Sequence, residues 1–276
     1  MEVSIAHQRI KVVTRHENVD AEDNLAVEEP LEIQLGYIES GKVVKKSISV
    51  TMRTPGNDDE LAAGFLFTEG IVSESTHIES VASSILDENK VVVTLSDDFQ
   101  PKLRSLERNF YTTSSCGVCG KASIDAIKTV SAYQNESGEM LVDKQVFFAL
   151  RDQLNHQQRI FESTGGLHAS ALFDLNGGFL KLKEDVGRHN ALDKLIGHAF
   201  LNGQLPLANH ILLLSGRASF ELIQKAAMAG IKIVAAIGAP SSLAAALAEE
   251  SNITLIGFLK NEKFNIYSGF ERISTI

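Results

Sequence analysis

The two cysteines of the chain lie within one four-residue window, and their spacing is the strongest chemical signal in the sequence. Cys116 and Cys119 belong to the run Ser114-Ser115-Cys116-Gly117-Val118-Cys119-Gly120-Lys121. Two thiols at this spacing can face one another, and such motifs can yield a nucleophilic thiolate. Because the chain has no other cysteine, it does not fit a disulfide-stabilised secreted scaffold. Redox chemistry, metal binding and sulfur handling are the chemistries that remain.

Four interpretations of this Cys-x-x-Cys motif stay open. Half of a zinc site would need two more ligands, and no H-x₃₋₅-H pair accompanies the motif. A thioredoxin-type dithiol normally follows an early strand and opens a helix, whereas this motif follows the polar stretch Asp97–Asn109. Structural cysteines are buried as small apolar groups, but serines, threonines and glycines surround these two. The fourth interpretation is a sulfur carrier, whose thiolate accepts a sulfane sulfur as a persulfide and passes it on.

A second group of reactive side chains occurs in Glu184-Asp185-Val186-Gly187-Arg188-His189-Asn190, between a predicted strand and a predicted helix. Two carboxylates, a guanidinium and an imidazole at a helix start could perform acid/base chemistry. They could also bind phosphate, since helix N-termini favour anions. Helix capping and a surface ion pair would explain the same residues without any ligand.

Three glycine-containing turns supply weaker candidates. Thr164-Gly165-Gly166-Leu167-His168 places His168 beside glycines that permit close backbone approach, although a lone histidine is more often a packed core residue. Ser215-Gly216-Arg217-Ala218-Ser219 could cradle a phosphate with Arg217 and its amides, but it lacks the Walker pattern. In Gly238-Ala239-Pro240-Ser241-Ser242, serine capping of a helix is a sufficient explanation.

The elements that must position these residues follow from hydrophobic periodicity and turn signals. The first region is β-rich, with predicted strands over Leu31–Leu35, Lys42–Val50 and Val91–Leu95 and a short helix over Leu61–Thr68 that Gly70 ends. A flexible loop is predicted over Phe110–Ile124. Beyond it we expect helices over Lys144–His156 and His189–Phe200, and strands over Ala169–Asp174 and Gly178–Lys183 joined at Asn176-Gly177.

The last third of the chain alternates apolar strands with helices, which indicates a largely parallel sheet covered by helices. The predicted elements are Ile211–Leu214, Ala218–Ala229, Ile231–Ile237, Ser241–Glu250, Ile253–Leu259 and Phe264–Tyr267. Open α/β sheets bind ligands at the carboxyl ends of such strands. The turns at Gly216 and Gly238 are therefore the first place to expect a site.

Composition narrows the class of protein. The chain has 276 residues, 44% hydrophobic and 22% charged, which is close to the globular average. A net charge of -9 disfavours an electrostatic nucleic-acid binder. No apolar stretch approaches the ~20 residues that span a bilayer, and Met1–Arg15 lacks a continuous apolar signal region. We therefore expect a cytoplasmic protein with neither nucleic-acid nor membrane partners.

Taken together and in this order, the motifs resemble the FdhD family of formate dehydrogenase accessory sulfurtransferases. The resemblance runs from Glu29-Pro30-Leu31-Glu32-Ile33 through Thr51-Met52-Arg53-Thr54-Pro55-Gly56-Asn57-Asp58 to the Cys motif. It also includes Leu61-Ala62-Ala63-Gly64-Phe65-Leu66 and continues through Glu184–Leu195, Ser215–Phe220 and Gly257–Tyr267, so that it covers nearly the whole chain.

The resemblance implies an α/β fold. It comprises a cytidine-deaminase-like core, with a mixed, largely parallel sheet flanked by helices, and a smaller β-rich N-terminal subdomain. The expected division is residues 1–109 for the N-terminal subdomain, 110–128 for the loop with the cysteines and 129–276 for the core. Where the zinc deaminases carry metal ligands, this sequence offers Arg188, His189 and Arg217 and no cysteine. We therefore expect the deaminase-like fold without its zinc.

The resemblance also implies a function. A member of this family receives sulfur from a cysteine desulfurase and delivers it to the molybdenum cofactor, in its bis(molybdopterin guanine dinucleotide) form, of a formate dehydrogenase. Cys116 matches the persulfide-bearing cysteine, Cys119 its partner, and Phe258–Lys263 the region associated with the cofactor. The resemblance further implies that the protein forms a homodimer. The rival hypotheses are a cofactor-binding chaperone that moves no sulfur and a dithiol oxidoreductase.

An acidic protein that binds a guanine dinucleotide must concentrate positive charge at the site. The basic residues Arg188, Arg217, Lys260 and Lys263 are the candidates. With the two histidines and the matched segment, the full set of candidate cofactor-binding residues is Arg188, His189, Arg217, His168, Phe258, Leu259, Lys260, Asn261, Glu262 and Lys263.

Overall fold

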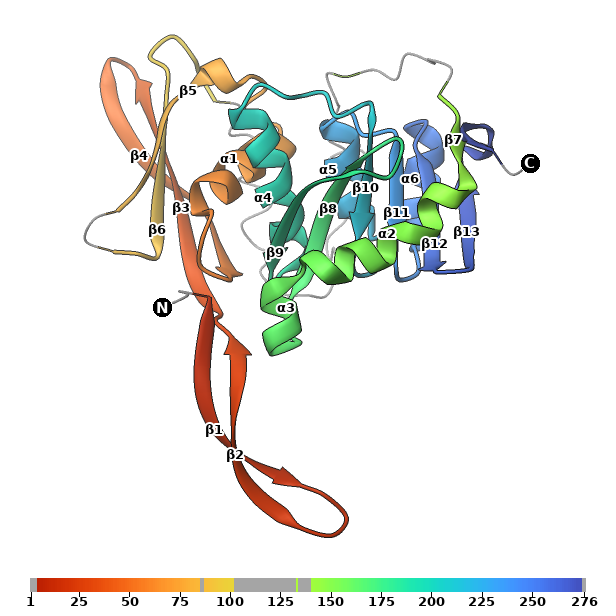
Figure 1. Cartoon of the computed structure of the whole chain (residues 1–276). Helices are drawn as coiled ribbons and strands as arrows, with labels where there is room; N and C mark the ends of the chain where they lie inside the picture. Colours follow the sequence, from red (N-terminus) through yellow and green to blue (C-terminus); the bar gives the residue numbers. More distant parts are fainter. Residues whose placement is uncertain (1–3, 85–86, 102–132, 134–139, 275–276) are drawn as a thin grey trace.

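The computed structural model describes residues 4–84, 87–101, 133 and 140–274, which fold into a mixed α/β structure built in layers. Figure 1 shows a β-sheet made by the first third of the chain, then a helical layer, then a larger sheet with a helix on its far face. One hydrophobic core lies between the two sheets and a second core lies behind the larger sheet.

The larger sheet has six strands in the order β13-β12-β11-β10-β8-β9. Their bounds are β8 (His168–Asp174), β9 (Phe179–Asp185), β10 (His210–Leu214), β11 (Ile233–Ala236), β12 (Thr254–Lys260) and β13 (Lys263–Ser268). The pairs β10–β11 and β11–β12 are parallel, and the other three described pairings are antiparallel. The sheet is mixed, as expected, but the expectation that it is largely parallel is wrong. Short turns join β8 to β9 and β12 to β13, and only antiparallel neighbours can be joined so tightly.

Helices cover both faces of this sheet. On one face lie α4 (Arg188–Leu201), α5 (Phe220–Met228) and α6 (Ser242–Glu250), and on the other lies α2 (Lys144–Gln157). Alternate residues of the strands pack in the two cores. Leu212 and Leu214 face α4 and α5, while Ile211 and Leu213 face α2. Strands that are buried on both faces explain the continuous apolar runs in the sequence.

The smaller sheet has the order β4-β3-β6-β5, and helix α1 (Asp58–Thr68) packs between it and α4. Its strands are β3 (Glu29–Glu39), β4 (Lys42–Arg53), β5 (Ile78–Ser83) and β6 (Lys90–Leu95). Two glycines allow α1 and α4 to touch: a Cβ added at Gly64 would lie 1.9 Å from the Asp193 carbonyl oxygen, and one at Gly197 would lie 1.8 Å from that of Glu60. The first third of the chain is therefore joined to the larger sheet through one continuous core.

Several helices and strands of the structure were not predicted from the sequence. The clearest is a hairpin of β1 (Ile5–Val13) and β2 (Asn18–Ala26), which projects away from the layers in Figure 1. Neither of its strands contributes to a core, so their residues are largely polar and charged. For this reason the sequence does not show the apolar alternation that predicts a strand. The others are α3 (Arg159–Thr164), the short pair β7 (Val142–Asp143) and β14 (Ile273–Ser274), β5, and the 3₁₀ turns Ser75–His77 and Phe270–Arg272.

The strands and helices that periodicity predicted are confirmed within a few residues at each end. Gly70 follows α1 with a φ of 71°, and the Ser241 hydroxyl accepts the Ala244 amide at the start of α6, as expected. The loop boundary at 110–128 lies outside the described residues, so the division into subdomains stays a prediction. None of the helices described in the structure combines the length and apolar character needed to cross a membrane.

Candidate functional site

The carboxyl ends of β10, β11 and β12 form one continuous edge, held together by backbone contacts. The Gly238 amide donates to the Gly216 carbonyl over 2.9 Å, and the Phe258 amide donates to the Gly238 carbonyl over 3.0 Å. A Cβ at Gly238 would lie 3.0 Å from both the Arg217 nitrogen and the Gly216 oxygen, so glycine favours this close approach. This sheet edge, formed by Ser215–Arg217, Gly238–Pro240 and Phe258, is the position at which open α/β sheets bind ligands.

Both candidate histidines reach the sheet edge. Strand β8 runs antiparallel to β10, so it begins where β10 ends and brings His168 beside Gly216, where an added Cβ would lie 3.2 Å from its Nδ1. His189, in the first turn of α4, has its Nε2 3.3 Å from the Ser219 hydroxyl and 3.7 Å from a Glu221 carboxylate oxygen. The sequence-predicted residues His168, His189 and Arg217 therefore converge on one edge.

The guanidinium groups of Arg188 and Arg217 supply positive charge at this edge, and the Glu221 carboxylate offsets part of it. Burial lowers the pKa of His168, and the positive charges of Arg188 and His189 lower it further, so its imidazole is neutral at pH 7. A hydrogen bond with His189 holds the pKa of Glu221 at about 2. The Nε of Arg188 is buried without a hydrogen-bond partner, and Arg217 is exposed with no ion pair among the described residues. Two guanidinium groups therefore have donors available for a ligand.

Two helices also begin at this edge with incompletely capped N-termini. The N-cap of α4 is Gly187, which has no side chain, and the Ser219 hydroxyl at the N-cap of α5 accepts no hydrogen bond from its helix. The Ser219 hydroxyl is instead within reach of His189. Amides at helix N-termini carry partial positive charge and suit phosphate or carboxylate groups.

The two carboxylates of the motif have structural roles, which corrects the acid/base interpretation. Glu184 accepts the amides of Ile160 and Phe161, over 3.3 and 3.0 Å, at the start of α3. Asp185 is completely buried, accepts the Gly187 amide over 2.8 Å and forms an ion pair of 2.7 Å with the buried Lys194. Because their oxygens are occupied in this way, capping and ion pairing explain both residues.

The segment Phe258–Lys263 divides between two places. Phe258 has a φ of 53° and is 43% exposed beside the sheet edge, whereas Leu259 is fully buried in the core behind the sheet. Leu259 faces α2 because side chains alternate along β12, so its side chain packs in the core, and the cofactor-binding role of this segment stays a prediction.

The rest of the segment, Lys260 to Lys263, forms the β12–β13 turn. Asn261 donates to both carboxylate oxygens of Asp152 in α2, over 3.1 and 3.0 Å. The turn and α2 line a surface pocket of about 550 Å³, with Arg151, Asp152, Asn155, Lys260, Asn261, Glu262 and Lys263 at its walls. The structure therefore separates these four candidates from the histidines and arginines at the sheet edge.

Cys116 and Cys119 lie outside the described residues. Within the described ranges, no three His, Cys, Asp or Glu side chains lie close enough together to hold a metal ion. Sequence reasoning named Ser219 only as the last residue of a possible phosphate-binding turn and missed Glu221, and both contact His189 from the start of α5. The only signal was a serine and a glutamate at the beginning of a predicted helix, which capping explains equally well.

Comparison with known proteins finds similarity along most of the chain. Residues 26–274 match the FdhD/NarQ family. The chain belongs to that family. Among curated FdhD/NarQ relatives, the "Sulfur carrier protein FdhD" of Streptomyces coelicolor is 46% identical over 91% of this chain and 89% of its own length. The protein of the same name from Mycobacterium tuberculosis is 44% identical over 99% of this chain and 100% of its own length.

A solved structure has the same fold. A formate dehydrogenase accessory protein from Desulfotalea psychrophila superimposes with a TM-score of 0.72, over 98% of this chain and 99% of that one. Its sequence identity is 22%, so the likeness concerns the fold. The mixed α/β class with helices flanking the sheets, expected from the sequence, is confirmed.

Proposed function

We propose that this protein is a sulfur carrier in formate dehydrogenase maturation, and that it carries sulfur as a persulfide on Cys116. The observation that carries the proposal is the 44 to 46% identity to proteins named sulfur carrier over more than nine-tenths of the chain. The Cys116-Gly-Val-Cys119 motif supplies the thiols that such a role needs. The sulfur donor is a cysteine desulfurase, and the acceptor is the molybdenum cofactor in its bis(molybdopterin guanine dinucleotide) form.

The chemistry is a transfer of sulfane sulfur between nucleophiles. The Cys116 thiolate attacks the outer sulfur of a desulfurase persulfide, so that a new S–S bond forms on Cys116 and the desulfurase cysteine leaves as a thiolate. Rates of such exchange depend on the pKa values and accessibility of both thiols. No external oxidant is needed, because the sulfur keeps its oxidation state. In this proposal Cys119 assists Cys116 without carrying the sulfur itself.

The sheet edge is the proposed binding place for the guanine dinucleotide part of the cofactor. Arg188 and Arg217 present guanidinium donors, and the N-termini of α4 and α5 add partial positive charge beside them. The pocket with Lys260 and Lys263 provides a second basic surface. An acidic chain with net charge -9 thereby gains local sites for a polyanion. We further propose that the protein acts in the cytoplasm as a homodimer.

Intact-mass spectrometry after incubation with a cysteine desulfurase and cysteine tests the carrier. Wild type should gain the mass of one sulfur atom, ~32 Da, that reductant removes, since exchange chemistry is reversible. Cys116→Ala should abolish this gain, and Cys119→Ala should weaken it less. Equal loading in Cys116→Ala and wild type would contradict the assignment of Cys116. Loading that never turns over when cofactor and dehydrogenase are added would favour the non-catalytic chaperone.

Nucleotide binding is tested with GDP as the probe. Arg217→Ala should weaken GDP affinity by roughly 10- to 150-fold, as expected for loss of one charge-assisted hydrogen bond worth about 1.5–3 kcal/mol. Lys11→Ala removes an equal charge from the projecting hairpin and should leave GDP affinity unchanged. Unchanged GDP affinity in Arg217→Ala, measured by calorimetry, would remove Arg217 from the site.

A further inference from the structure

We propose that Thr54, in the turn between β4 and α1, is a positioning residue for the sheet-edge site. It belongs to the small sheet's part of the chain and touches no proposed ligand. Its contacts instead fix the start of α4, from which Arg188 and His189 reach the edge. This inference rests on the proposed function, because it assigns the control of that site to the N-terminal part of the chain.

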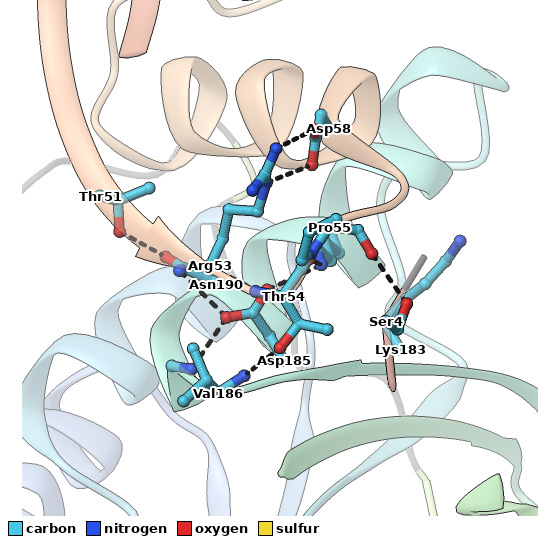
Figure 2. Close-up of polar contacts among 12 residues, drawn as sticks. Ser4, Thr51, Arg53, Thr54, Pro55, Asp58, Lys183, Asp185, Val186 and Asn190 are labelled. Carbon is cyan, nitrogen blue, oxygen red and sulfur yellow. Dashed lines mark hydrogen bonds and ion pairs between the residues drawn. The ribbon is translucent and has the colours of Figure 1, made fainter. Parts of the chain in front are cut away.

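Thr54 is 1% exposed and uses three polar atoms to hold the junction of β9 and α4. Its hydroxyl accepts the Val186 amide over 3.2 Å, and its own amide donates to the Asp185 carboxylate over 3.2 Å. Its carbonyl accepts the Lys194 ammonium over 2.8 Å. Figure 2 shows the Thr54 hydroxyl against Val186, beside the Asp185 carboxylate.

The turn that carries Thr54 is itself rigidly held. Arg53, 1% exposed, donates from Nε and Nη2 to both carboxylate oxygens of Asp58, over 3.1 and 3.0 Å (Figure 2). Such a two-bond pair fixes orientation as well as distance. One strand position earlier, the Met52 carbonyl accepts the Asn190 side chain over 2.8 Å. Through these contacts of Thr54, the position of the small sheet fixes the position of α4.

The contact with Val186 acts at the point where displacement matters most for the site. Val186 is two residues before Arg188, and the intervening Gly187 amide is held by Asp185 over 2.8 Å. With both amides bound, the first turn of α4 has one orientation relative to the sheet edge. A shift of Val186 would displace Arg188 and His189, so it should weaken binding by these two residues.

The test compares three substitutions of buried threonines. Thr54→Val keeps the shape of the side chain and removes the acceptor for Val186, whereas Thr54→Ser keeps it. Thr68→Val is the matched control, because Thr68 is also buried, lies at the end of α1 opposite to the turn, and donates to Asp193 of α4 over 2.8 Å. Each variant is measured for GDP affinity, for unfolding by denaturant and for the NMR shifts of the His168 and His189 imidazoles.

We expect Thr54→Val to bind GDP about tenfold more weakly and to shift both imidazole resonances, with Thr54→Ser near wild type. Thr68→Val should be destabilised while its GDP affinity and imidazole shifts stay unchanged. Unmoved imidazoles in Thr54→Val, or equal effects in Thr68→Val, would overturn the positioning role. If wild type binds no GDP while Thr54→Val still moves the imidazoles, the nucleotide site is wrong and the positioning role stands.

Discussion

At the scale of single residues, His168 is the group whose protonation the fold changes at the sheet edge. Burial disfavours its charged form, and Arg188 and His189 add repulsion, while Asp185 opposes them with less effect. The result is an imidazole that stays neutral at pH 7 beside the Arg188 guanidinium. A neutral imidazole can accept a hydrogen bond or a proton from a ligand at the edge, which Arg188 and Arg217 cannot do.

This environment predicts a pH dependence of stability. The unfolded chain binds a proton on His168 near pH 6.5, but the folded chain binds it only at lower pH. The contribution of neutral, buried His168 to the free energy of unfolding is therefore fully present above pH 6.5. It is lost as pH falls from 6.5 through the lowered pKa. His168→Gln should show a smaller loss of unfolding free energy between pH 7.5 and 5.5 than wild type, measured by urea titration. The exposed His16→Gln is the control, and an equal slope in His168→Gln would contradict the assignment.

At the scale of elements, the crossing of α1 and α4 decides how the small sheet joins the rest. Gly64 and Gly197 bring the two helix backbones into contact, with each glycine facing a carbonyl of the other helix. Larger residues here would separate the helices and with them the turn that holds Thr54 against Val186. The packing of this one helix pair therefore determines the geometry of the sheet edge.

Gly197→Ala tests this crossing. Alanine is normally favoured over glycine inside a helix by about 1 kcal/mol, but here its Cβ would lie 1.8 Å from the Glu60 carbonyl oxygen. We expect the free energy of unfolding to fall by about 1–3 kcal/mol, as for other overpacked cores. Gly166→Ala is the control, since its Cβ would meet Ala26 at an ordinary 3.6 Å. A Gly197→Ala variant as stable as Gly166→Ala would show that the helices can separate freely.

At the scale of the whole molecule, a buried charged cluster ties the layers together. Lys225 of α5, 6% exposed, donates to Asp193 of α4 over 3.0 Å and to Thr68 at the end of α1 over 2.9 Å. Burial on its own lowers the pKa of Lys225, but the carboxylates of Asp193 and Glu69 outweigh it and raise the pKa. Lys225 therefore remains charged and joins three helices in the core between the two sheets.

Lys225→Met should destabilise the whole fold, because it leaves Asp193 buried without its cation. Breaking a buried ion pair in this way costs about 3–5 kcal/mol. Lys11→Met breaks the exposed pair with Asp20, whose side chains are 62% and 87% exposed, and should cost about 0–1 kcal/mol. Adding Asp193→Asn to Lys225→Met should recover part of the loss in denaturant unfolding. Equal costs for the two single variants would contradict the structural role of Lys225.

The sequence by itself determined the local elements and the chemical character of the protein. Alternating apolar runs predicted β10, α5, β11, α6 and β12, because burial on both faces of a sheet requires such runs. The turns at Gly216 and Gly238 were predictable as a site because strand ends that follow one another share an edge. The Cys116-x-x-Cys119 motif and the order of the remaining motifs were sufficient to recognise the family.

Only the tertiary structure decided which of these residues act together. Asp185 and Arg188 lie three positions apart, yet the first is buried against Thr54, 131 positions away, while the second faces the edge. Leu259 and Phe258 are neighbours on opposite faces of β12. Hydrophobic periodicity records how each segment meets solvent or core, whereas contacts between distant segments depend on how helices and sheets pack. That packing determines which polar side chains face one another and which remain free to bind a ligand.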